Sequence, residues 1–228
     1  MPLYAQDDFE SDSLSKIWSQ RLIAPGSLQL QSEIVRSGKK AVRITVHKGD
    51  MFSAGNSQSK ANERGELTEV NELWSAEGVK CCYSFSLFLP QNFPLVPTRL
   101  VLAQWKQYDK FNSALVDNPL IALRYVNGVL YITLQTTEKK TTVFQTNDDV
   151  RGRWLDFVFT IAFTRTHQGM LSISLNEKDI VKYTGPTAYP DNYNYPSPGR
   201  FYFKFGLYRD AMPEPMTVYF DQYRKETF

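Results

Sequence analysis

Apolar and polar residues alternate along much of the chain, in short runs that end at Pro, Gly or Asn. This two-residue period is typical of β-strands, because successive side chains of a strand face opposite sides of a sheet. The pair Asn127-Gly128 between two apolar runs is a strong hairpin signal. We predict strands at Cys81–Leu89, Leu100–Lys106, Leu120–Tyr125, Val129–Leu134, Trp154–Phe163, Met170–Leu175, Ile180–Tyr183, Arg200–Tyr208 and Met216–Tyr223.

Helical patterning is confined to short pieces such as Ser13–Ser19. About a dozen short strands, with no helix long enough to connect parallel strands, predict an all-β fold: an antiparallel β-sandwich of the jelly-roll, lectin-like type. A chain of 228 residues can bury a substantial core, and β-sandwiches of this length are often one domain. We therefore expect a single domain over residues 1–228.

Two irregular stretches interrupt the predicted strands, at Lys48–Glu63 and Gly185–Gly199. Both are rich in Gly, Ser, Asn or Pro, and this polarity predicts that neither packs deeply. Loops of this length in compact domains are often functional rims or lids, although plain surface loops are equally common.

The formal net charge of +2 gives no global basic field, so we expect no nucleic-acid partner. No run approaches the ~18 apolar residues of a membrane span, and Met1–Asp8 lacks the basic start and apolar core of a signal peptide. We expect no membrane association, and either a cytoplasmic location or, if a leader was removed, a secreted or periplasmic one. The adjacent Cys81 and Cys82 face opposite sides of a strand, which predicts no disulfide between them.

Three predicted strand segments place polar residues on alternate positions, so that each has one polar and one apolar face. The polar positions are Arg64 and Glu66, then Gln104 and Lys106, then Tyr202, Lys204 and Tyr208. We expect the intervening Trp105 to lie in the core. A sheet with such a face predicts a concave groove for an acidic, hydroxylated polymer, and the 13 Tyr and 4 Trp are compatible with a sugar ligand.

Other chemistries lack support in the sequence. His47 and His167, together with the two cysteines, have no zinc-site spacing, and there is no phosphate loop or Gly-x-Ser-x-Gly elbow. The run from Glu66 to Glu72 resembles the Glu-x-Asp-x-x-Glu strand of laminarinase-like glycoside hydrolases, which need two carboxylates in the cleft. However, Thr68 stands at the Asp position, and Glu66 and Glu69 would face opposite sides. Hydrolysis is therefore the weaker alternative.

The order of Arg64-x-Glu66, Gln104-x-Lys106 and Tyr202-x-Lys204-x-Gly206-x-Tyr208 resembles the concanavalin-like jelly-roll polysaccharide lyases. The likeness is greatest to the glucuronan lyase and heparin lyase I-like group, in which Phe203–Arg209 is nearly typical, and more distant to alginate lyases. The resemblance implies β-elimination on a uronic acid-containing, anionic polysaccharide, without a required cofactor. A structural calcium ion is left open, because Asp and Asn are plentiful in loops although no ligand cluster stands out.

Elimination removes the C5 proton of a uronate, so the adjacent carboxylate must be neutralised and the developing enolate stabilised. The resemblance implies that Gln104 neutralises the carboxylate, while Arg64 and Lys204 help to bind acid groups. It also implies that Tyr208 protonates the departing glycosidic oxygen; crowding by Lys204 and Arg209 would favour its ionised form, so that it serves as base and acid in turn. Substrate-binding residues are expected to be Glu66, Lys204, Tyr202 and Arg209.

The identity of the base stays open, because Lys106 stands where alginate lyases have a histidine. Lys106 acts as the base if desolvation lowers its pKa; alternatively it only binds carboxylate while Tyr208 does both jobs, or His47 reaches the groove from a neighbouring strand. We favour the second arrangement. Thr68 stands where alginate lyases carry a second Arg, which counts against alginate as the substrate.

A different class of function remains on the same predicted fold, because fold does not fix function. A non-catalytic, lectin-like module would use the same face to bind acidic carbohydrate without cleaving it. Arg64 and Glu66 could also simply pair on a solvated surface, an arrangement worth at most about 1 kcal/mol.

Overall fold

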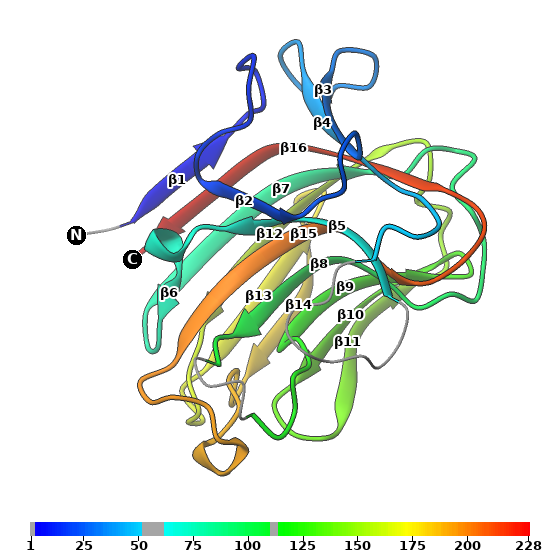
Figure 1. Ribbon diagram of the computed structural model, residues 1–228. Coiled ribbons are helices and arrows are strands. Elements are labelled where there is room, and N and C mark those ends of the chain that lie inside the picture. Colours follow the sequence, from blue (N-terminus) through cyan, green and yellow to red (C-terminus); the bar gives the residue numbers. More distant parts are fainter. Residues whose placement is uncertain (1–2, 52–61, 110–113) are drawn as a thin grey trace.

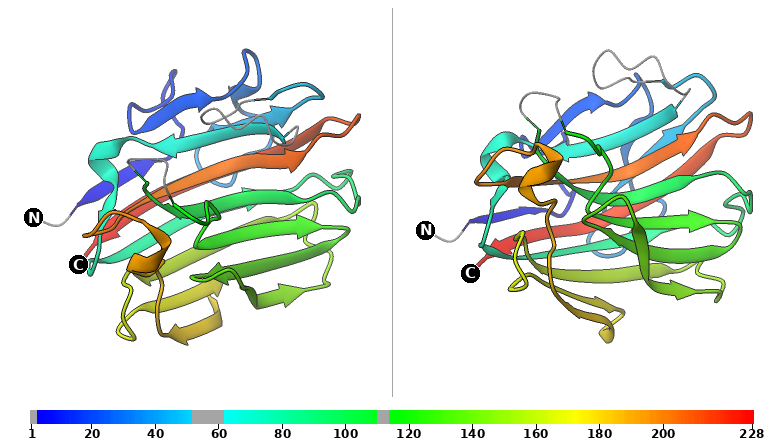
Figure 2. Two further views of the ribbon diagram at one scale, coloured as in Figure 1. Left: turned by 60° about the horizontal axis from the view of Figure 1, so that its bottom comes forward. Right: turned by 90° about the horizontal axis from the view of Figure 1, so that it is seen from below.

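Two antiparallel sheets stack face to face in the computed structural model, whose described residues are 3–51, 62–109 and 114–228 (Figures 1 and 2). Sheet A contains, in spatial order, β14 (Lys178–Thr184), β13 (Met170–Leu175), β12 (Trp154–Ala162), β7 (Lys80–Phe88), β16 (Met216–Thr227), β4 (Ala41–Val46) and β3 (Leu28–Gln31), with β1 (Tyr4–Asp7) also paired to β16. Sheet B contains β11 (Lys140–Thr146), β10 (Val129–Gln135), β9 (Ile121–Val126), β8 (Leu100–Gln107), β15 (Arg200–Asp210), β5 (Asn62–Glu69) and β2 (Trp18–Leu22), with β6 (Ser75–Ala76) paired to β15.

The predicted all-β sandwich is confirmed, and the alternation of apolar residues explains its core. One hydrophobic cluster fills the space between the sheets, and it includes Trp105, Phe203 and Phe205, each at most 1% exposed. These rings come from alternate positions of neighbouring strands, and Trp105 and Phe203 lie 4.7 Å apart between ring centroids. The apolar face of sheet B is therefore buried against sheet A, and polar groups lie on its other face.

The predicted strands are present, with ends that differ by a few residues, but the sequence pattern did not predict β1 to β4, β6 or β11. Ser13–Ser19 is not helical, because Trp18 begins β2 and is buried with its Nε1 donating to Asp7 Oδ2 at 2.8 Å. Within the described residues the helical structure amounts to two short 3₁₀ turns, η1 (Asn71–Leu73) and η2 (Asp191–Tyr193).

The two irregular stretches have different outcomes. Most of Lys48–Glu63 lies outside the described residues. Gly185–Gly199 packs more deeply than predicted, since Tyr189, Tyr193 and Tyr195 are buried and the rings of Tyr189 and Tyr195 stack at 5.2 Å. The tyrosines of this segment, rather than its Pro and Gly, decide how it packs.

Strand β15 occupies the centre of sheet B, between β5 and β8, as the orange ribbon of Figure 1 shows. Its pairing with β8 shifts register between Phe205 and Tyr208, and Gly206 there has φ +134°. A Cβ atom on Gly206 would overlap the carbonyl oxygen of Gly65 on β5. The glycine thus allows the close approach of two central strands and the irregular pairing beside Tyr208.

Candidate active site

Strand register brings the three polar segments together on the outward face of sheet B. Lys204 lies opposite Gln104 on β8 and Thr68 on β5, and Tyr208 lies opposite Arg64. We call this surface the polar face; its predicted members are Arg64, Glu66, Gln104, Lys106, Tyr202, Lys204 and Tyr208. Segments that are far apart in the sequence therefore meet, as the resemblance implied.

Gln104 and Glu66 form the recessed centre of the polar face, with 3% and 1% of their surface exposed. The Gln104 side-chain amide donates a hydrogen bond to Glu66 Oε1. This contact fixes the direction of the amide and leaves its second N–H available for a ligand. Glu66 therefore positions Gln104 in the free protein.

Arg64 also lies at this centre, but not all of its N–H groups have hydrogen-bond partners there. Its Nη1 lies 3.8 Å from Glu66 Oε2, a contact at the outer limit of an ion pair. Arg64 Nε and Glu66 Oε2 are buried without a hydrogen-bond partner among the described residues. Buried polar groups are normally paired, so these two atoms are candidates for contact with a bound molecule.

Tyr208 is flanked by two guanidinium groups. The Cζ atoms of Arg64 and Arg99 lie 4.1 Å and 4.6 Å from the centroid of its ring. Burial lowers the pKa of Arg99, but Asp210 and Tyr208 outweigh that effect and raise it above its ordinary value. The expected flanking cations were Lys204 and Arg209; the structure instead shows Arg64 and Arg99 against the ring.

The prediction that Arg209 binds substrate is wrong. Arg209 follows Tyr208 directly and therefore faces the opposite side of β15, where it is fully buried. Its Nη2 lies 2.7 Å from Glu63 Oε2, and its Nη1 donates to the carbonyl oxygen of Glu214 at 2.6 Å. Arg209 is part of an internal ion pair.

The two lysines of the polar face differ in charge behaviour. Burial lowers the pKa of Lys106, but Tyr202, Asp117 and Glu66 together raise it above the ordinary value, and its Nζ donates to Asp117. Burial lowers the pKa of Lys204 to about 8, with Lys106 and Arg64 acting in the same direction and Glu66 opposing them. Lys106 therefore keeps its proton at neutral pH, which removes the argument that desolvation makes it a base.

His47 lies just after β4, in sheet A, and its side chain is 58% exposed. Its Nδ1 is 3.5 Å from Asp50 Oδ2, and the Asp50 carbonyl oxygen accepts a hydrogen bond from the backbone N–H of Arg64. The turn that carries His47 thus adjoins the start of β5. Among the described residues, no hydrogen bond or ion pair joins the His47 ring to the polar face.

Tyr202 belongs to an aromatic group at one end of the polar face. Its ring stacks on Trp74 at 5.1 Å, and Trp74 also contacts the ring of Tyr108 at 4.7 Å. Burial, more than any neighbouring charge, raises the pKa of Tyr202. Aromatic rings with polar edges suit contact with sugar rings, so this end can support a polymer that extends beyond Gln104.

The sequence reading missed Arg99, Arg124 and Trp74. Arg124 had a signal, since it is the one charged residue of the apolar run Leu120–Val126 and shares a face with Ala122, which lies opposite Gln104. Arg99 and Trp74 lie outside regular strands, so alternation does not place them. Only tertiary packing brings them to Tyr208 and Tyr202.

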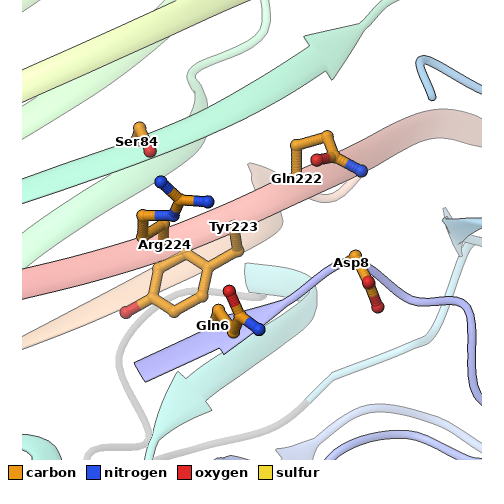
Figure 3. Close-up of a pocket in the computed structure, with 6 residues that line it drawn as sticks. All are labelled: Gln6, Asp8, Ser84, Gln222, Tyr223 and Arg224. Atoms are coloured by element: carbon orange, nitrogen blue, oxygen red, sulfur yellow. The ribbon is translucent and has the colours of Figure 1, made fainter. Parts of the chain in front are cut away.

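A separate small pocket lies on sheet A, lined by Gln6, Asp8, Ser84, Gln222, Tyr223 and Arg224 (Figure 3). It is on the other sheet from the polar face and contains none of the predicted site residues. In the described ranges, no group of three or more His, Cys, Asp and Glu residues is arranged to hold a metal ion. No helix in the part of the chain that the structure describes is long and apolar enough to cross a membrane.

Comparisons with known proteins agree with this geometry. The sequence matches the polysaccharide lyase family over residues 9–224, and no curated protein matches it. Among solved structures, the endo-β-1,4-glucuronan lyase of the fungus Trichoderma reesei superposes with a TM-score of 0.73 at 16% identity, covering 98% of this chain and 94% of that one. The alginate lyase vAL-1 from Chlorella virus gives a TM-score of 0.57 at 12% identity, covering 89% and 94%.

At such identities the likeness to solved structures shows the shared fold, and the family match carries the assignment. The jelly-roll sandwich hosts many functions, and here the family match narrows the class to enzymes that act on polysaccharides. Within it, the chain belongs to the polysaccharide lyase family and is a polysaccharide lyase. This decides between the enzyme and the two alternatives, the lectin-like module and the laminarinase-like hydrolase. The internal position of Glu69, bonded to Lys225 at 3.0 Å, also leaves the hydrolase without its second carboxylate.

Proposed function

We propose that this lyase cleaves a uronic acid-containing polysaccharide by β-elimination at the centre of the polar face. The observation that carries the proposal is the placement of the Gln104 amide, the Arg64 guanidinium and the Tyr208 ring on one recessed surface of sheet B. The glucuronan and alginate lyases that share the fold act on anionic polysaccharides of this kind. The substrate class fits the cations that surround these groups.

In the proposed reaction, Gln104 and Arg64 bind the carboxylate of the reacting uronate and stabilise the charge that develops on it. An amide N–H and a guanidinium both donate to carboxylate oxygens, and their hydrogen bonds strengthen as an enolate forms. Lys204 adds positive charge beside them. Glu66 holds Gln104 in place, so its role is positioning in addition to the expected contact with substrate.

Tyr208 then moves the proton. The C5–H bond breaks, a C4–C5 double bond forms, the C4–O bond breaks, and the proton taken from C5 passes to the departing glycosidic oxygen. Arg64 and Arg99 lie against the Tyr208 ring and place positive charge beside it during the proton transfer. The raised pKa of Lys106 supports a carboxylate-binding role for that residue, and no cofactor enters the proposed steps.

The test is a Tyr208→Phe variant on polyglucuronate, alginate, heparin and hyaluronan, followed by the ultraviolet absorbance of the unsaturated product. We expect wild type to release product from at least one polymer, and the variant to lose about 100-fold or more in kcat with KM changed little, since only one hydroxyl is removed. His47→Gln serves as the comparison and is expected to stay active.

Three results would overturn the proposal in part or whole. Binding to one or more of the four polymers without release of an unsaturated product would contradict the proposed β-elimination. Full activity of Tyr208→Phe would remove Tyr208 from the chemistry. An inactive, folded His47→Gln variant that still binds polymer would make His47 the base in place of Tyr208.

A further inference from the structure

Arg124 on β9 is a buried cation without an acidic partner among the described residues. It is 5% exposed, and its Nε donates to Thr133 Oγ1 at 3.2 Å. The described residues supply no hydrogen-bond partner for its two terminal nitrogens. Burying a charge without a counter-ion costs free energy, and a bound anion would offset that cost.

Strand register places Arg124 beside the proposed reaction centre. It lies opposite Val101 on β8, which lies opposite Tyr208 on β15, so that all three face the same side of sheet B. Ala122, two residues away on β9, lies opposite Gln104. Arg124 is therefore about 7 Å along the strand and one strand, about 4.8 Å, across from Gln104.

Positively charged groups outnumber negatively charged ones around Arg124. Burial lowers the pKa of Arg124, and Arg99 lowers it further, while Tyr131 and Tyr208 oppose the change. Burial, then Arg124 and Arg99, lowers the pKa of Lys140 on β11. Asp210 is already paired with Arg99 at 2.6 Å. We call the three cations Arg99, Arg124 and Lys140 the arginine subsite.

We propose that the arginine subsite binds the carboxylate of a second sugar residue, adjacent to the residue that reacts at Gln104 and Tyr208. The proposal rests on the proposed function and deepens it. A planar guanidinium whose terminal nitrogens have no hydrogen-bond partner among the described residues is suited to a bidentate hydrogen bond with a carboxylate. The subsite then selects polymers in which consecutive residues are anionic, and it rejects chains in which a neutral sugar occupies the second position.

The experiment compares Arg124→Met with wild type on polyglucuronate and on the same polymer with part of its carboxyl groups reduced. On polyglucuronate we expect KM to rise about tenfold or more, with kcat within about threefold, because a charge-assisted contact in the bound state is lost. Wild type prefers the unreduced polymer, and the variant loses most of that preference. Arg124→Lys keeps the charge and recovers part of the affinity.

Stability separates a binding role from a structural one. Since Arg124→Met removes an unpaired buried charge, its Tm is expected to be equal to or above that of wild type. The matched control is Arg224→Met, which removes an exposed cation on sheet A and is expected to leave KM unchanged. A lower Tm together with a higher KM, or an unchanged KM, would overturn the inference.

Failure of the proposed function has a different signature. If wild type releases no product from polyglucuronate, the proposed elimination on that polymer is wrong. The binding affinity for the same polymer is then measured by calorimetry instead of KM. An affinity about tenfold weaker in Arg124→Met then still supports the subsite. Equal affinities of wild type and Arg124→Met contradict it.

Discussion

Replacing Lys204 by Met tests whether the polar face keeps a buried charge at the expense of stability. Lys204 is 7% exposed, and burial lowers the pKa of its ammonium group from 10.5 to about 8. Each pKa unit corresponds to about 1.4 kcal/mol, so the charged form costs about 3 kcal/mol in the folded state. Met has a similar length and no charge, and Lys204→Met removes that cost.

The pH dependence gives the sign of the effect. Between about pH 8 and 10.5 the unfolded chain holds the Lys204 proton and the folded chain does not, so wild-type stability gains from this group as pH rises. Below about pH 8 the cost is fully present, and by about pH 10 roughly a quarter of it remains. Lys204→Met should therefore exceed wild type in Tm by roughly 6–12 °C at pH 7, and the gap should narrow toward pH 10.

The assay is thermal unfolding of both proteins from pH 7 to pH 10, with Lys182→Met as the control. Lys182 on β14 is paired with Asp179 and its side chain is 76% exposed, so its replacement should change stability by about 0.5 kcal/mol or less. A gap between Lys204→Met and wild type that is absent at pH 7, or that does not change with pH, would refute the reasoning.

Activity supplies the second half of the test. If the charge of Lys204 binds substrate carboxylate, wild-type kcat/KM falls as pH rises through about 8, where the lysine loses its proton. Lys204→Arg keeps its charge throughout this range, so it should move the alkaline fall to higher pH. The same pH profile in both proteins would show that the charge of residue 204 does not limit binding.

Arg209→Met leaves Glu63 buried without its partner, so we expect a loss of about 3–5 kcal/mol and a markedly lower Tm, with KM of the folded protein unchanged. A raised KM at unchanged Tm would instead show that Arg209 binds substrate. Gly206→Ala combines a positive φ with overlap of the Gly65 carbonyl and should lower Tm more than Gly49→Ala, where φ is also positive but the space is open. Equal effects in thermal unfolding would show that backbone strain alone matters at Gly206.

Much of the site could be read from the sequence because alternation is a local property. Glu66 and Gln104 reach the polar face, and Trp105 and Glu69 the interior, as the two-residue period requires. The same rule already excluded Arg209, which follows Tyr208 and must face the other way. The error came from reading the end of the Tyr202–Arg209 motif as one functional unit, without applying the period to its last residue.

Other features needed neighbours that are distant in the sequence. The raised pKa of Lys106 depends on Tyr202 and on Asp117, which come from other parts of the chain. Arg99 directly precedes β8, and its guanidinium contacts the ring of Tyr208 only because β8 and β15 are paired. No local pattern specifies either contact.

The sequence by itself determined that this chain is an antiparallel sandwich with one polar face, and its motif order indicated a lyase. These results follow from side-chain alternation and residue type, which are set within a few residues of chain. The tertiary structure decided which polar groups meet, which are paired, and which keep an unbalanced charge. Those outcomes depend on the register of strands from distant parts of the sequence and on the loss of water around each group, and both arise only when the two sheets pack.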